Sequence, residues 1–215
     1  MGASAAARTG SAAALCCLVL SLAYVAAQLA EWTGALGSAG GPNAASTALG
    51  IALLLTPSLL LGPAFVVTMA ALHAAAPEAR RVFTLAGLAF AAMYATLTGL
   101  VYVVQLTFVA PRIAAGATAD IGLLLFVPYR SFLFAVDLYG YALMSAATLI
   151  AAFGLPDVPA RHAANRAMVA NGLLLPFLAF QMFVPQLIWI ASAWGVTFPL
   201  AMILLRRLFR QMPGG

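Results

Sequence analysis

Polar residues recur at helical spacing inside several strongly apolar segments of the chain. The first stripe is Ser21, Tyr24, Gln28 and Glu31, in steps of three, four and three, which places all four side chains on one helical face. Two later stripes are Tyr94, Thr98, Tyr102 and Gln105, and then Arg130, Asp137, Tyr141, Ser145 and Thr148. A polar side chain in hydrocarbon is costly unless it faces protein or trapped water. The pattern therefore predicts helices whose polar stripes point inward and meet.

The boundaries of the apolar segments predict six spans, all α-helical because a spanning segment must satisfy its own backbone hydrogen bonds. The expected spans are residues 12–30, 47–72, 83–109, 131–153, 167–183 and 188–205. The last two are separated by a short hairpin that contains Pro185, and a single merged helix would be too long for one span. Kinks are expected at the prolines inside the spans, Pro57, Pro63, Pro176 and Pro199.

The amino-acid composition indicates the class of protein to which this pattern belongs. Hydrophobic residues make up 65% of the chain and charged residues only 7%, and the mean hydropathy is +1.05, which leaves too little polar surface for a water-soluble globule. We expect an all-α, polytopic transmembrane helix bundle that forms a single integral membrane domain over residues 1–215. The composition resembles that of small multi-pass bacterial membrane proteins, so the expected location is a cell membrane, the bacterial inner membrane.

The formal net charge of +5 is explained by topology, because the arginines are scattered in short loops. No aromatic and basic cluster of the nucleic-acid-binding kind is present, and we expect no nucleic-acid partner. With both termini cytoplasmic, only Arg112 and Arg130 face outward. The cytoplasmic set is then Arg8, Arg80, Arg81, Arg161, Arg166, Arg206, Arg207 and Arg210.

The same topology places the strongest polar residues in the outer half of the bundle, where we expect a pocket for a small or lipophilic molecule. Its predicted ligand-binding residues are Gln28, Glu31, Tyr102, Gln105, Arg130, Asp137, Tyr141 and Gln181.

Asp137 is the strongest candidate for a functional residue, since an ionisable group deep in hydrocarbon costs much free energy. Arg130, Tyr102 or Tyr141 is its expected partner, and a polar knot that only fixes helix packing remains the alternative. Glu31 is expected mainly as a boundary charge beside the interfacial anchor Trp32.

Missing residues and motifs narrow the chemistry further. The chain has no lysine, which excludes a retinal or pyridoxal Schiff base. Both histidines, His73 and His162, fall on the cytoplasmic side without a completing carboxylate or thiolate, so no metal site is predicted. No hydrolase or phosphate-binding motif is present, and no particular cofactor is indicated.

Three functions remain open at this point. The first is a binding protein or carrier that uses the predicted pocket. The second is an accessory subunit of a larger membrane complex, for which the small residues Gly87, Ala91, Ala95 and Gly99 offer a ridge for close helix contact, within this chain or with an oligomeric partner. The third, less favoured, is an intramembrane enzyme that uses Asp137 or Glu31.

Overall fold

The computed structural model of the protein describes residues 3–212. Helices make up 78% of the structure, and the described residues contain no strand, which confirms the predicted all-α class. The main α-helices are α1 (Ala3–Trp32), α2 (Ala48–Ala75), α3 (Arg81–Val104), α4 (Ala110–Ala114), α5 (Phe132–Ala151), α6 (Arg161–Gly172), α7 (Leu175–Ala179), α8 (Ile188–Ala191) and α9 (Trp194–Arg210). A π-helical turn, Gln105–Val109, joins α3 to α4, and 3-10 turns cover Glu78–Arg80, Ala119–Leu124, Ala152–Gly154 and Pro185–Leu187.

Five helical segments in the described range are long and apolar enough to cross a bilayer, which supports a membrane protein. They are Ala5–Trp32, Ala48–Ala75, Glu78–Ala114, Phe132–Gly154 and Pro185–Arg210. These segments correspond to five of the six predicted spans.

The segment predicted as a span over residues 167–183 is built differently. Its helix starts earlier, at Arg161, and is interrupted after Gly172, so that α6 and α7 are two short helices. Pro176 has no N–H to bond the carbonyl of Gly172, four residues earlier, and this explains the interruption. By contrast, α2 continues through Pro57 and Pro63, and α9 through Pro199.

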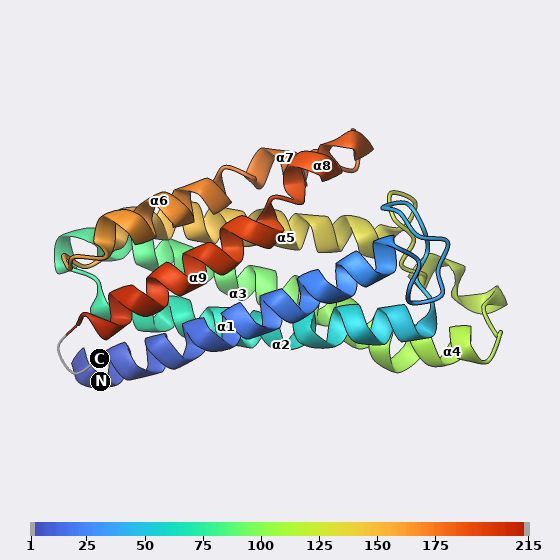
Figure 1. The fold of residues 1–215 in the computed structure, drawn as a ribbon, viewed down its shortest axis with the longest axis horizontal. Coiled ribbons are helices and arrows are strands. Elements are labelled where there is room, and N and C mark those ends of the chain that lie inside the picture. The colour runs from blue at the N-terminus through green and yellow to red at the C-terminus, as the bar shows by residue number, and fades with distance from the viewer. Residues whose placement is uncertain (1–2, 213–215) are drawn as a thin grey trace.

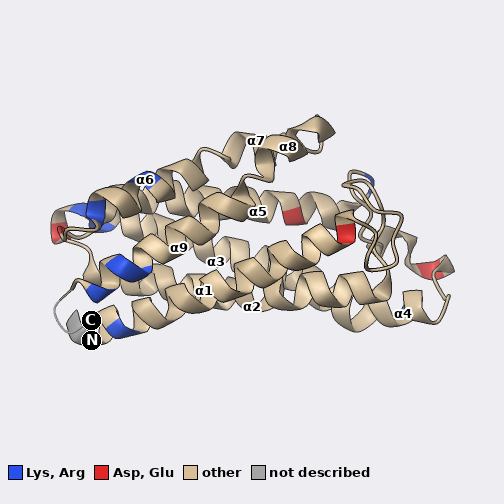
Figure 2. Ribbon diagram, in the orientation of Figure 1, with Lys and Arg blue, Asp and Glu red and all other residues tan. Residues whose placement is uncertain are grey.

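The helices form an elongated bundle in which α1 begins and α9 ends at the same end (Figure 1). The opposite end carries the two long connections, residues 33–47 and 115–131. The pair α6 and α7 follows the length of the bundle beside α5 and returns through α8 into α9 (Figure 1). Arginines concentrate at the end that holds both termini (Figure 2), and we call it the arginine-rich end.

Apart from Arg130, the polar stripes point inward, as their spacing predicts. Ser21, Tyr94, Thr98, Tyr102, Gln105, Ser145 and Thr148 are all fully or almost fully buried. Asp137 and Tyr141 are also buried, whereas Tyr24 and Gln28 are half-buried. Around them the core contains large rings, among which Phe65 contacts Tyr94 and Phe198 edge-on.

The ridge of small residues on α3 is used for packing within this chain. A Cβ at Gly87 would lie 2.7 Å from the Cβ of Ala151 and 2.9 Å from the carbonyl oxygen of Ala147, both on α5. On another side of α3, Ala95 approaches Gly62 of α2. The small residues thus allow α3 to sit close to two neighbouring helices.

Candidate functional site

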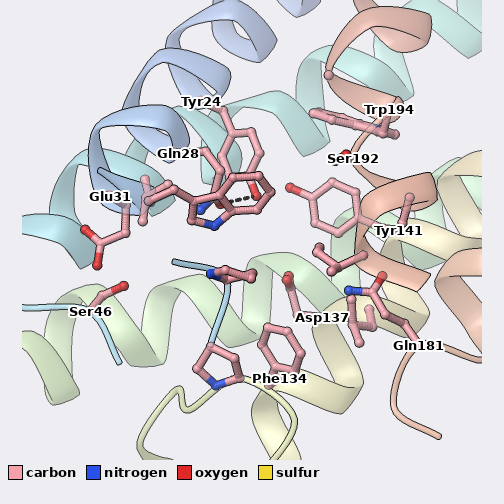
Figure 3. Close-up of a pocket in the computed structure, with 18 of the residues that line it drawn as sticks. Tyr24, Gln28, Glu31, Ser46, Phe134, Asp137, Tyr141, Gln181, Ser192 and Trp194 are labelled. Atoms are coloured by element: carbon pink, nitrogen blue, oxygen red, sulfur yellow. Dashed lines mark hydrogen bonds between the residues drawn. The ribbon is translucent and has the colours of Figure 1, made fainter. Parts of the chain in front are cut away.

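A cavity of about 430 Å³ lies in the half of the bundle away from the arginine-rich end, and we call it the chamber. Its walls come from α1, α2, α3, α5, α7, α8 and α9, together with residues of the connections 33–47 and 115–131. Figure 3 shows the side chains of these segments around one space. Six of the eight residues predicted from the sequence line it, namely Gln28, Glu31, Tyr102, Asp137, Tyr141 and Gln181.

The chamber's first wall is the polar stripe of α1. Because α1 is an uninterrupted helix, Tyr24, Gln28 and Glu31 project from one face. The Tyr24 hydroxyl donates a hydrogen bond of 2.9 Å to Oε1 of Gln28, one turn further along. This bond orients the amide of Gln28, so that the wall presents fixed polar groups.

The opposite wall belongs to α5 and α3. Asp137 is 8% exposed, and its Oδ1 is buried without a hydrogen-bond partner. One helical turn further along α5, Tyr141 accepts a hydrogen bond of 3.2 Å from the hydroxyl of Tyr102 on α3. Asp137 therefore borders the cavity directly and is not enclosed by protein on all sides.

Arg130 is not brought to Asp137, although a spacing of seven residues predicted a shared face. The helix begins one residue after Ser131, which adopts an extended backbone and caps it by accepting a hydrogen bond from the N–H of Phe134. Arg130 therefore lies in the preceding turn, where helical spacing does not apply, and is exposed outside the chamber lining. Neither ion pair of the described residues involves it.

Gln105 is buried, but it does not line the chamber. It opens the π-helical turn that precedes Pro111, and its Nε2 donates a hydrogen bond of 2.7 Å to the carbonyl of Leu124. A π-helical turn has i→i+5 hydrogen bonds in place of i→i+4, which changes the faces that its residues occupy. The observed contact is thus structural, tying α3 to the connection that covers the chamber.

Glu31 is only 3% exposed, so it is not the solvated boundary charge that its position beside Trp32 suggested. Its carboxylate lies against Gly50, where an added Cβ would be 2.5 Å from Oε2. Gly50 is in the first turn of α2, and the N-terminus of a helix stabilises a nearby negative charge. Both carboxylate oxygens are buried without a hydrogen-bond partner.

Gln181 anchors the connection 115–131 at the chamber. It is fully buried, and its Nε2 donates a hydrogen bond of 3.0 Å to the hydroxyl of Tyr129. Tyr129 has a φ of 60°, a left-handed backbone that is rare for a bulky side chain. Burial raises the pKa of Tyr129, and the hydrogen bond from Gln181 opposes that rise.

Aromatic rings that the site prediction did not include complete the lining. Trp194 meets Tyr141 edge-on, with ring centroids 5.2 Å apart, and meets Tyr24 in the same way at 5.7 Å. Its Nε1 donates a hydrogen bond to the sulfur of Met144. Tyr24 could have been found from its stripe, but a tryptophan within an apolar span produces no periodic signal.

The chamber reaches the molecular surface along the seam between α1 and the segment from α8 to α9. Leu29 and Val196 both line the chamber, yet they are 57% and 70% exposed. Further along, Val25 closes the seam by packing against Gly195. A Cβ added at Gly195 would lie 3.2 Å from Cγ2 of Val25. Leu29 and Val196 thus flank the opening with apolar side chains, and Ser192, which also lines the chamber, is exposed on the same segment.

Within the described residues, no group of three or more histidine, cysteine or acidic side chains is arranged to hold a metal ion. Comparison of the chain with family models, curated proteins and solved structures gives no match.

Proposed function

We propose that this protein is a membrane-embedded binding protein for a small lipophilic molecule, which occupies the chamber. One observation carries the proposal. Buried polar groups of α1, α5 and the connection after α7 adjoin a cavity that opens between apolar side chains. Oδ1 of Asp137 and Oε1 of Gln181 have no hydrogen-bond partner among the described residues of the protein, and both residues line the cavity, where a ligand could supply one.

The proposed setting is a bacterial inner membrane, crossed six times, with both termini in the cytoplasm. The arginine-rich end supports this orientation under the positive-inside rule. α1 begins and α9 ends at the same end of the bundle, which supports an even number of crossings. The broken pair α6 and α7 would supply the sixth crossing, and the chamber would lie in the outer leaflet.

In this setting the seam beside Leu29 and Val196 would face hydrocarbon, so that a ligand could reach the chamber from the lipid phase. The volume of about 430 Å³ lies within the range of pockets for small molecules. Apolar lining residues such as Leu54, Leu138 and Ile188 would hold its body.

The test is to fill the chamber and measure binding of an uncharged lipophilic dye, N-phenyl-1-naphthylamine, by energy transfer from tryptophan. Ala191 is buried and lines the chamber, whereas Ala193, two residues further, is exposed and does not. We expect Ala191→Phe to weaken saturable binding at least about tenfold, because the ring would occupy ligand space. Ala193→Phe should bind as the unmodified protein does. Equal binding by both variants, or no saturable binding at all, would refute the proposal.

A further inference from the structure

The chamber has an unbalanced charge. Two carboxylates, Asp137 and Glu31, line it, and no arginine does. The chain has no lysine that could supply a positive charge instead. The arginine-rich end differs, because there Asp157 forms ion pairs with both Arg80 and Arg161.

Arg112 and Arg130 lie at the chamber's end of the bundle, but neither lines the chamber. The guanidinium of Arg112 lies 3.4 Å from the centre of the Phe108 ring and donates a hydrogen bond to the Phe108 carbonyl. Arg130 is exposed outside the lining. A buried carboxylate is strongly destabilised unless a positive charge or hydrogen bonds compensate it. Oδ1 of Asp137 receives no hydrogen bond from any protein group in the described range.

The rings beside Asp137 form a corner. The planes of Tyr24 and Tyr141 are inclined by 34° to each other, and Trp194 stands nearly perpendicular to both, at 88° and 89°. Aromatic rings around a cavity are a common recognition site for quaternary ammonium groups, which are attracted to the ring faces. Figure 3 shows Asp137 beside the same space as Tyr141 and Gln181.

We propose that the ligand carries a permanent or protonated ammonium group on an apolar body, with the cation placed between Asp137 and the rings of Tyr24, Tyr141 and Trp194. This inference rests on the proposed binding function and adds the ligand's charge. Asp137 would supply the ion-pair partner, and the apolar lining would hold the remainder of the molecule. Oε1 of Gln181 offers an acceptor for an N–H donor.

The same ammonium chemistry occurs in free amphiphiles and in lipid headgroups. A headgroup brings a phosphate with it, and no arginine of the lining could pair with that phosphate. The two carboxylates would repel it. The lining therefore favours an ammonium compound without an anionic group.

The experiment compares two probes of the same shape, 2-phenylethyltrimethylammonium and its uncharged carbon analogue 3,3-dimethylbutylbenzene, on the purified protein in neutral detergent. Quenching of tryptophan fluorescence reports binding, since Trp194 lines the chamber. We expect the cation to bind at least about tenfold more tightly than the analogue, because only the cation gains the ion pair and the ring contacts. Asp137→Asn should remove most of that difference.

Asp120→Asn is the matched control. Asp120 is exposed and lies outside the chamber at the same end of the bundle, so this variant changes the net charge equally. It should leave the preference for the cation intact. If Asp137→Asn fails to fold, the comparison of the two probes on the unmodified protein still decides the matter.

The outcomes separate the two proposals. If both probes bind equally, the binding function stands and the ammonium inference is overturned. If neither probe binds saturably, the result counts against both. Added short-chain phosphatidylcholine distinguishes the sources, because competition by it and not by phosphatidylglycerol would assign a lipid headgroup, and no competition by either would assign a free amphiphile. Equal competition by both lipids would overturn the ammonium inference.

Discussion

At the scale of single residues, Asn171 on α6 is a buried polar group outside the chamber that bonds two other helices. It is fully buried, donates a hydrogen bond of 3.0 Å to the Thr148 hydroxyl on α5 and accepts one of 3.0 Å from the Thr197 hydroxyl on α9. Three helices are thus joined through one amide. This network stabilises the broken segment α6 and α7 against its neighbours.

Thr197→Val should therefore destabilise the protein by about 1 kcal/mol, because it leaves Oδ1 of Asn171 buried without this donor. The measurement is the free energy of unfolding in mixed micelles. Thr96→Val makes the same chemical change at an exposed position, where the hydroxyl bonds only the carbonyl of Ala92 in its own helix. Its effect should be within about 0.5 kcal/mol of zero. Equal destabilisation by the two variants would show that the network contributes no stability.

Single residues also show where prediction from the sequence succeeds and where it fails. The spacing placed Tyr102, Asp137 and Tyr141 correctly on inward faces, because a helix repeats regularly. It misplaced Arg130 because a capping residue, Ser131, ended the repeat. Trp194 was missed because an apolar residue in an apolar span does not stand out, although it lies at the aromatic corner.

At the scale of helices, α3 offers a test of close packing with its control on the same ridge. Gly87→Ala should cost roughly 1–3 kcal/mol of unfolding free energy, because the new methyl group meets the backbone carbonyl of Ala147 on α5. Gly99 has no atom within 4 Å of an added Cβ, so Gly99→Ala should be neutral or stabilise the helix by up to about 1 kcal/mol. Unfolding in mixed micelles measures both. If Gly87→Ala proved as benign as Gly99→Ala, the proposed close contact of α3 with α5 would be wrong.

The helix boundaries were predictable only where the apolar runs were uniform. Five helical segments contain the predicted spans or nearly so, since length and hydropathy determine them. Their ends differ, because α1 begins at Ala3, well before the predicted start at residue 12. The segment from Arg161 to Ala179 was not predictable in detail, because polar residues start its helix early and Pro176 interrupts it. At Pro57, Pro63 and Pro199 the helix continues, so proline alone does not say which helix will break.

At the scale of the whole molecule, the number of crossings depends on α6 and α7, the one segment too interrupted to count among the long apolar helices. Two arrangements of α6 and α7 relative to the membrane can be distinguished. If the segment crosses the bilayer, the connection at residues 180–187 lies on the side opposite the arginine-rich end. If α6 and α7 do not cross the bilayer, the connection at residues 180–187 lies on the same side as the arginine-rich end. In that case α9 would have to end on the opposite side of the membrane.

Single cysteines in a chain with Cys16 and Cys17 replaced by alanine distinguish these arrangements with a membrane-impermeant maleimide on intact spheroplasts. Gln186 and Pro159 are both exposed and lie at the two ends of the broken segment. We expect Gln186→Cys to be labelled at once and Pro159→Cys only after permeabilisation, because six crossings put them on opposite sides. Asn43→Cys, in the connection after α1, is the positive control for outside labelling. Protection of Gln186→Cys in intact spheroplasts, with Asn43→Cys labelled, would rule out the sixth crossing.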